Sequence, residues 1–232
     1  MHNTLSVVIP CFNEEQTIAE VVSTVLKQPT VGQVIIIDDN SSDSSLLEIL
    51  KFSNNRKVEI LKNKINMGKG YSVSRGLQLI RCKYIIIQDA DLEYDPSEYK
   101  KILKPMVDGL ADVVYGSRFI GSEMHRVNYF WHKVGNRFLT TLSNMFSNLS
   151  LSDMETCYKA FTSDVAKKIS LKEKRFGLEP ELTAKFAKLN CKVYEVSISY
   201  RGRTYSEGKK ITWKDGFSAI RCIFKYNLFS RH

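Results

Sequence analysis

Two aspartates separated by one residue, Asp89 and Asp91, are the most informative chemical feature of this sequence. In an extended chain, residues i and i+2 point to the same side, so the two carboxylates can face one ligand together. They follow an apolar run, Tyr84–Ile87, that is typical of a buried strand. Paired carboxylate oxygens at a strand end suit a hard divalent cation, although a solvated turn has the same pattern.

Two further polar segments follow apolar runs. Asp38–Asp43 comes after Val34–Ile37, and Cys11–Glu14 comes after Leu5–Pro10. The first carboxylates of Asp38–Asp43 could accept the ring N–H of a uracil or guanine base, or a ribose hydroxyl. Asx turns and the capping of a following helix would also explain this segment.

The elements that must position these residues alternate between strands and helices. The sequence predicts four strands with helices between them in the first half: strands 5–10, 34–37, 57–61 and 84–87, and helices 14–27, 46–52 and 70–80. Continuously apolar strands that alternate with helices predict a mostly parallel, Rossmann-like α/β sheet with helices on both faces. Ligands of such sheets bind at the carboxyl ends of the strands, where the three polar segments fall.

The second half predicts fewer strands and more aromatic, basic segments. A helix begins at Asp95-Pro96, which form a good N-cap and first turn. The expected elements are helix 95–107, strand 112–115, an aromatic segment 127–149, helix 180–189, strand 193–200, a basic loop 201–210 and helix 211–229. No linker is evident, so we expect one domain over 1–210 and a C-terminal amphipathic helix over 211–232.

Composition limits the classes of protein. The five cysteines are widely spread, which argues against a disulfide framework and favours a reducing compartment. No window predicts a membrane span or a signal peptide, and the four histidines do not cluster. A net charge of +9 favours anionic partners, among which nucleic acid, phosphorylated ligands and an acidic membrane surface remain open.

An ordered set of motifs resembles the family 2 glycosyltransferases of the GT-A fold. The likeness is greatest to the branch that contains dolichyl-phosphate mannose and glucose synthases, many of which carry C-terminal membrane spans that this sequence does not predict. The matching segments are VVIPCFNEE (7–15), IIIDDNSSD (35–43), NMGKG (66–70), QDADLEYDP (88–96), YGSRF (115–119), DMETCYKAF (153–161), RFGLEPELTAKFAK (175–188) and SYRGRTYSEGKKITWKDG (199–216). Each motif is weak by itself, but the ordered set over most of the chain is specific.

The resemblance implies an inverting transfer of a hexose from a UDP- or GDP-sugar to a polyprenyl phosphate. It also implies Mg²⁺ or Mn²⁺ on Asp89 and Asp91, which would neutralise charge on the leaving diphosphate. The expected catalytic residues are Asp91, Arg118, Asp153 and Glu155. The expected donor-binding residues are Pro10, Asn13, Glu14, Asp39, Lys69, Asp89, Ala90, Asp91, Arg201, Arg203 and Lys209.

The identity of a general base depends on the acceptor. A hydroxyl acceptor requires a carboxylate to take its proton, and Asp153 or Glu155 could do so. A lipid phosphate is largely ionised near pH 7 and requires no base, in which case Asp153 would orient the sugar or the acceptor. Sequence alone leaves both mechanisms open.

Three other functions are alternatives to transfer of a hexose to a polyprenyl phosphate. The main alternative is a soluble glycosyltransferase that acts on a sugar hydroxyl in cell-surface polysaccharide or glycan synthesis. A nucleotidyltransferase would open with a Gly- and Arg-rich phosphate loop, which is absent. A basic nucleic-acid-binding module is disfavoured because the strands end in carboxylates that would repel a phosphate backbone, so we expect no nucleic-acid partner.

Two segments predict contact with a membrane surface. In the C-terminal helix, apolar residues recur at helical spacing and basic residues flank them. The stripe comprises Trp213, Phe217, Ile220, Phe224 and Leu228, and Tyr129–Leu149 is a second candidate. We therefore expect a cytoplasmic protein that is peripheral on the inner face of the membrane, with or without a membrane-protein partner. Packing of the C-terminal helix on its own domain is the other interpretation.

Overall fold

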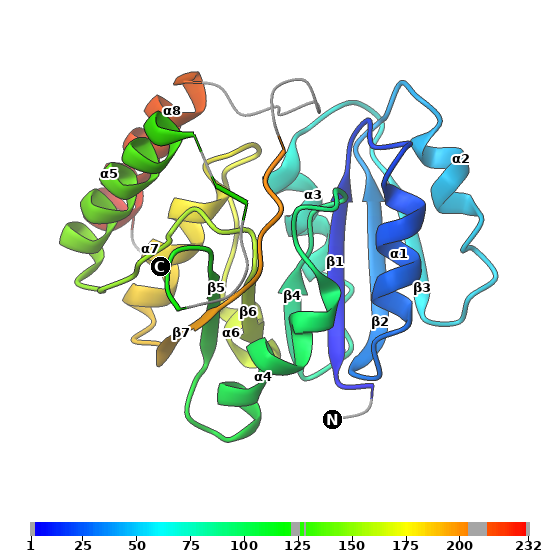
Figure 1. Cartoon of the computed structure of the whole chain (residues 1–232), viewed down its shortest axis with the longest axis horizontal. Coiled ribbons are helices and arrows are strands. Elements are labelled where there is room, and N and C mark those ends of the chain that lie inside the picture. The colour runs from blue at the N-terminus through cyan, green and yellow to red at the C-terminus, as the bar shows by residue number, and fades with distance from the viewer. Residues whose placement is uncertain (1–2, 122–125, 128, 204–212, 231–232) are drawn as a thin grey trace.

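The computed structural model describes residues 3–121, 126–127, 129–203 and 213–230, and only the backbone of 213–215. These residues form a seven-stranded sheet with the order β3-β2-β1-β4-β6-β5-β7 (Figure 1). The strands are β1 (Leu5–Cys11), β2 (Val31–Asp38), β3 (Val58–Lys62), β4 (Tyr84–Ile87), β5 (Val113–Ser117), β6 (Lys159–Thr162) and β7 (Val193–Ser197).

All pairings in this sheet are parallel except those of β6, which runs antiparallel to both β4 and β5. The helices are α1 (Ile18–Leu26), α2 (Ser45–Leu50), α3 (Lys69–Leu77), α4 (Tyr99–Val107), α5 (Phe130–Ser147), α6 (Ser163–Lys168), α7 (Leu178–Lys188) and α8 (Trp213–Phe224). A 3₁₀ turn, η1 (Pro96–Glu98), precedes α4, and a π-helical turn, η3 (Lys225–Phe229), follows α8.

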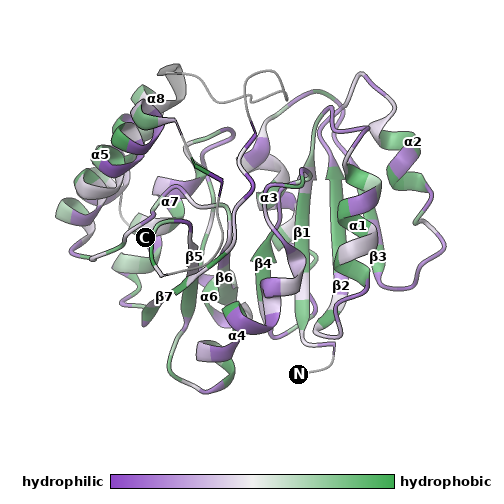
Figure 2. Cartoon of the chain, viewed as in Figure 1, coloured by the Kyte–Doolittle hydropathy of each residue, from purple (hydrophilic) through white to green (hydrophobic). Residues whose placement is uncertain are grey.

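The central strands are buried on both faces, as their apolar sequences require. Every residue of β4 and β5 is buried, and the apolar residues of the central strands form the green interior in Figure 2. Close packing of α3 on the sheet depends on Gly76, because a Cβ there would lie 2.5 Å from the Val8 side chain. The predicted α/β fold with a mostly parallel sheet is confirmed.

The structure differs from the sequence-based elements at β6. The segment Lys159–Thr162 has one buried lysine and only four residues, so it lacks the long apolar run that identifies the parallel strands. Helix α1 begins at Ile18 rather than Glu14, after a turn closed by the carbonyl of Glu14. The predicted cap at Asp95 is confirmed, since its side chain accepts a hydrogen bond from the backbone N–H of Ser97.

The C-terminal helix packs on the rest of the fold. Helix α8 lies beside α5 and also contacts α7 (Figure 1). It buries Ala219, Cys222 and Ile223, whereas Phe217 is 67% exposed. Packing on its own domain, one of the two interpretations of this helix, is therefore observed, and contact with a membrane stays a prediction.

Glu173 ties the loop before α7 to this C-terminal pair of helices. Its carboxylate accepts hydrogen bonds from Arg221, Lys225 and Tyr226. Burial opposes ionisation, but these three donors prevail and lower the pKa of Glu173 to about 2. Among the described residues, no helix has both the length and the apolar character needed to cross a membrane.

Candidate active site

A cavity of about 1380 Å³ opens where the strands β1, β2, β4 and β5 end. The loops after these strands bring residues such as Phe12, Asp39, Asp89 and Arg118 to its wall. Helices α5, α7 and α8 supply a further part of the lining, including Trp131, Glu179 and Phe217. The cavity exceeds the usual 300–1,000 Å³ of a small-molecule site, so it has room for two ligands.

Each aspartate of the pair after β4 has its own cationic partner. Lys69 at the start of α3 lies 2.8 Å from the Asp89 carboxylate and 3.0 Å from Glu179 on α7. Arg203 contacts Asp91 with a nitrogen–oxygen distance of 2.5 Å. The negative charge of each carboxylate is therefore balanced by a neighbouring cationic side chain.

Asp91 is the harder of the two carboxylates to ionise. Burial, followed by the charges of Asp89 and Glu93, raises the pKa of Asp91 to about 7. The pKa of Asp89 is instead lowered, because Lys69 outweighs the effect of its burial. A carboxylate that ionises with difficulty in the apo protein gains stability when a cation is added beside it.

These side chains fit a divalent ion that takes most of its ligands from a substrate. In the part of the chain that the structure describes, no group of three or more His, Cys, Asp or Glu side chains is arranged to hold a metal. Mg²⁺ is usually bound by one or two carboxylates together with phosphate oxygens and water. Asp89 and Asp91 supply that number of carboxylates.

Asp39 connects the loop after β2 to the segment that leads into α3. Its carboxylate accepts hydrogen bonds from the Asn63 side chain and from the backbone N–H groups of Met67 and Gly68. Gly68 has a φ of 95°, a conformation that favours glycine, and a Cβ there would lie 2.4 Å from a backbone oxygen. Asp39 therefore positions Lys69 in addition to lining the cavity.

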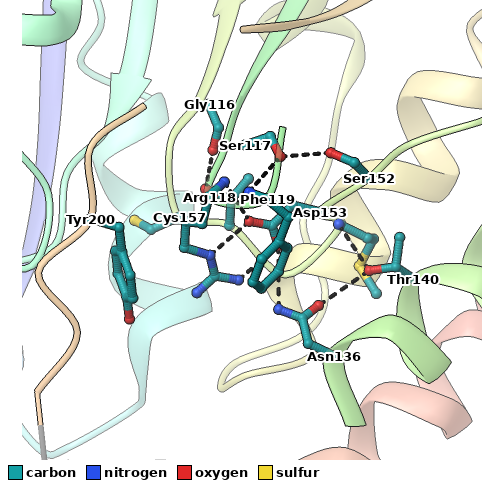
Figure 3. A network of polar contacts seen from close by, with 12 residues as sticks. Gly116, Ser117, Arg118, Phe119, Asn136, Thr140, Ser152, Asp153, Cys157 and Tyr200 are labelled. Carbon is teal, nitrogen blue, oxygen red and sulfur yellow. Dashed lines mark hydrogen bonds and ion pairs between the residues drawn. The ribbon is translucent and has the colours of Figure 1, made fainter. Parts of the chain in front are cut away.

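Arg118 and Asp153 form a buried bidentate pair (Figure 3). The Arg118 Nε and Nη2 atoms each donate to Asp153 over 2.7 Å, and the Arg118 backbone N–H donates to the same carboxylate. Burial alone would raise the pKa of Asp153, but Arg118 reverses that effect and holds it below the usual value. Asn136 of α5 also donates to Asp153.

Two glutamates face the same cavity with incomplete hydrogen bonding. Glu155 Oε1 and Glu179 Oε2 are buried and have no hydrogen-bond partner among the described residues. Burial, followed by the charge of Glu179, raises the pKa of Glu155 to about 7. Lys159 lies behind them, fully buried, and its ammonium donates to the Thr156 carbonyl.

The structure brings most of the predicted site residues to one cavity. The cavity wall contains Pro10, Glu14, Asp39, Lys69, Asp89, Ala90, Asp91, Arg118, Glu155 and Arg203. Asn13 does not line it but bonds to Ser41 and Ser42, which joins the loops after β1 and β2. Asp153 lies behind Arg118, Arg201 is exposed outside the lining, and Lys209 is outside the described residues.

Sequence reasoning missed several residues of the wall. Glu179, Tyr200 and Glu93 line the cavity but were not predicted as site residues. Glu179 lies in the first turn of α7, where a glutamate usually only stabilises the helix by interacting with the positive end of its dipole. Its position inside the motif RFGLEPELTAKFAK (175–188) was the sequence signal that could have identified it.

Comparison with solved structures identifies the class of fold. The chain superposes on a crystal structure of glucosyl-3-phosphoglycerate synthase from Mycobacterium tuberculosis in complex with Mn²⁺, UDP-glucose and phosphoglyceric acid. The TM-score is 0.73 and the identity 17%, over 99% of this chain and 81% of that one. Another structure of the same enzyme contains Mg²⁺ and UDP. This chain has the GT-A fold.

The family follows from the sequence itself. The model of glycosyl transferase family 2 matches residues 6–170, so the chain belongs to this family and is a glycosyltransferase. An uncharacterized protein of Methanocaldococcus jannaschii is 27% identical, with 96% of this chain and 92% of that protein covered. The undecaprenyl-phosphate 4-deoxy-4-formamido-L-arabinose transferase of Edwardsiella ictaluri is also 27% identical, with 88% and 62% covered.

Proposed function

We propose that this protein transfers a hexose, with inversion, from a UDP- or GDP-sugar to a polyprenyl phosphate. One observation carries the proposal: a single cavity holds both a charged cluster and an apolar wall. The charged cluster includes Asp89, Asp91 and Lys69, and the apolar wall is built by α5 and α8. The first suits a sugar diphosphate and the second suits the chain of a lipid phosphate.

The donor would bind against the ends of β1, β2 and β4. A Mg²⁺ or Mn²⁺ ion held by Asp89 and Asp91 would neutralise charge on the leaving diphosphate. Lys69 and Arg203 line the same region and would add positive charge there. Binding of UDP-glucose with Mn²⁺ by the structurally similar mycobacterial enzyme supports this placement.

The acceptor phosphate would bind at Arg118. Asp153 fixes the Arg118 guanidinium through Nε and Nη2, so a phosphate in the cavity would be met by Nη1. An ionised phosphate is itself the nucleophile, and no side chain has to remove a proton. Transfer to undecaprenyl phosphate by the Edwardsiella relative supports this class of acceptor.

An exposed stripe of α5, which reaches the cavity wall at Phe138, is a candidate for contact with the membrane that holds such a lipid. Phe130, Val134 and Phe138 are exposed at intervals of four residues, and Lys133 and Arg137 lie beside them. A helix with this pattern would lie on an anionic membrane surface. We propose that the protein is peripheral on the cytoplasmic face of that membrane.

Substituting this apolar stripe is expected to weaken binding to the membrane. The double variant Phe130→Ser/Val134→Ser should bind anionic vesicles at least about tenfold more weakly, because two inserted side chains are lost. Vesicle co-sedimentation measures this. Leu47→Ser/Leu110→Ser is a matched control, since both leucines are exposed outside the cavity lining and off α5 and α8. If both double variants bind the vesicles as tightly as the wild type does, α5 is not the membrane contact.

The direct test of function is release of nucleoside diphosphate. Purified protein with Mn²⁺ or Mg²⁺ is assayed against UDP- and GDP-hexoses, with and without a polyprenyl phosphate. Release that requires one donor and the lipid would establish the proposed reaction. Donor-specific release without the lipid would shift the acceptor to another class, and no release with any donor would contradict the proposal.

Transfer to a sugar hydroxyl is the second candidate, and Glu155 is the observation that favours it. A buried carboxylate with a pKa of about 7 is poised to act as a general base near neutral pH. Under this alternative, Glu155→Gln would abolish turnover and the rising limb of the pH–rate profile. Under the proposed reaction, the variant would keep measurable turnover.

Glu155 also predicts a pH dependence of stability. Its pKa in the folded state lies above the usual 4.5, so the unfolded chain releases this proton first as pH rises. The contribution of Glu155 to the free energy of unfolding is therefore fully present below about pH 4.5, and it is lost as the pH rises through about 7. Urea unfolding should show that Glu155→Gln is more stable than wild type at pH 8 by about 1–3 kcal/mol, with no such gain at about pH 4.5.

A further inference from the structure

The guanidinium of Arg203 lies among three carboxylates of the cavity. Its Nη2 is 2.5 Å from Asp91 Oδ2, its Nη1 is 3.1 Å from Glu14 Oε2, and its Nε is 3.7 Å from Glu93 Oε1. The three acidic residues come from the loops after β1 and β4, and all of them line the cavity. A single side chain thus supplies a positive charge where the carboxylates converge.

The backbone near Arg203 is fastened to the same place. The Arg203 N–H donates to Glu93 Oε1 over 2.6 Å, the Arg201 N–H donates to the Glu93 carbonyl, and the Tyr200 hydroxyl donates to Glu93 Oε2. The segment 200–203 is therefore docked on residues 91–93. Arg203 can leave Asp91 by rotation of its own side chain while this docking persists.

The hydrogen bonding of Arg203 at this position is incomplete. Its Nε is buried and has no hydrogen-bond partner among the described residues, because the nearest Glu93 oxygen is 3.7 Å away. A buried donor without a partner carries a desolvation cost, and a guanidinium forms its strongest contacts when two parallel N–H groups meet two oxygens. A diphosphate would offer that geometry, whereas the three separate carboxylates do not.

We propose that Arg203 takes the place of the divalent cation in the donor-free enzyme. Asp91, whose Oδ2 contacts Arg203, is one of the two carboxylates that would hold the metal. The cation and the guanidinium then compete for Asp91, and an arriving diphosphate removes the competitor by binding Arg203 itself. Metal and nucleotide therefore bind with positive linkage. This inference rests on the metal-dependent donor site of the proposed function.

The experiment is a Mn²⁺ titration of the intact protein by electron paramagnetic resonance, alone and with saturating UDP or GDP. The wild type should bind Mn²⁺ weakly alone and more tightly with nucleotide. Arg203→Gln should bind Mn²⁺ alone about tenfold more tightly than the wild type, equivalent to about 1.4 kcal/mol. The gain in Mn²⁺ affinity that nucleotide produces should shrink by a similar factor, because the competitor is already gone.

A matched variant separates this effect from a change in overall charge. Arg81→Gln removes one positive charge from an exposed pair with Glu59 outside the cavity lining, and its Mn²⁺ affinity should equal that of the wild type. Arg203→Lys keeps a cation near Asp91 and should fall between the wild type and Arg203→Gln. Thermal melting of each variant confirms that it is folded.

The possible failures are distinguishable. Equal or weaker Mn²⁺ binding by Arg203→Gln, with a wild type that binds Mn²⁺ and nucleotide, would overturn the competition and leave the proposed function intact. Absence of Mn²⁺ binding by both proteins, even with UDP or GDP, would overturn the metal site and this inference together. An Arg203→Gln protein that binds Mn²⁺ where the wild type does not would support the inference.

Discussion

Asp91→Ala is expected to reduce sugar transfer by at least about a hundredfold to a thousandfold, the range found when one main electrostatic contact to a transition state is lost. The Asp91 side chain would share the metal with Asp89, and losing one of these two carboxylates would weaken the binding and positioning of the ion at the diphosphate. Nucleoside diphosphate release under saturating donor and Mn²⁺ measures the loss.

The same substitution should leave the protein folded. Burial and the charges of Asp89 and Glu93 disfavour the ionised form of Asp91 and raise its pKa, so its removal relieves repulsion in the metal-free protein. Arg203 retains Glu14 as a partner. We expect a melting temperature at about pH 8 that is no lower than that of the wild type.

Asp108→Ala serves as the control for Asp91→Ala. Asp108 is a carboxylate at the end of α4 that pairs with Lys104 and does not line the cavity. Its removal should leave turnover unchanged. Normal turnover of Asp91→Ala itself would show that the assignment of the metal is wrong.

The polar residues at the carboxyl ends of the strands could be predicted, because local sequence patterns identify the strands that they follow. Val34–Ile37 and Tyr84–Ile87 are continuously apolar, and the polar residues that follow each of them must emerge at the carboxyl edge of a parallel sheet. Strand β6 was not predictable in this way, since it is short and contains Lys159. The buried lysine has its ammonium on a backbone carbonyl and near the Tyr115 ring, contacts that no periodicity reveals.

The roles within the site were less predictable, because they depend on pairs of residues distant in sequence. Arg118 and Asp153 were predicted as separate catalytic residues, with Asp153 as a possible base, but these residues, 35 positions apart, form one ion pair. Arg203 was predicted as a donor-binding residue, and the structure adds a contact with Asp91 that the motif does not reveal. Residue type and motif position identify such side chains, but only the fold shows which charges meet.

Arg118→Met is expected to destabilise the protein by about 3–5 kcal/mol, the usual cost of leaving one partner of a buried ion pair uncompensated. The Asp153 side chain is fully buried, and without Arg118 its nearest charge-bearing donor is lost. The melting temperature should fall by roughly 10 °C for a chain of this length. Urea unfolding at about pH 7 provides the free energy directly.

The double variant Arg118→Met/Asp153→Asn separates the structural role of this pair from its chemical role. Removing both charges eliminates the unpaired carboxylate, and the amide introduced at position 153 can still bond to Asn136, so most of the lost stability should return. If Arg118 binds the acceptor phosphate, the double variant should nevertheless remain about a hundredfold below the wild type in kcat/KM for the polyprenyl phosphate.

The donor side provides the internal control for that double variant. Affinity for the nucleotide should be unchanged, because Arg118 follows β5, whereas the proposed donor site lies at the ends of β1, β2 and β4. Recovery of both stability and lipid-dependent turnover would mean that Arg118 serves the fold alone, and the acceptor phosphate would then have to meet another cation of the cavity. Recovery of stability without turnover would show that this ion pair has a chemical role in transfer beyond its role in the fold.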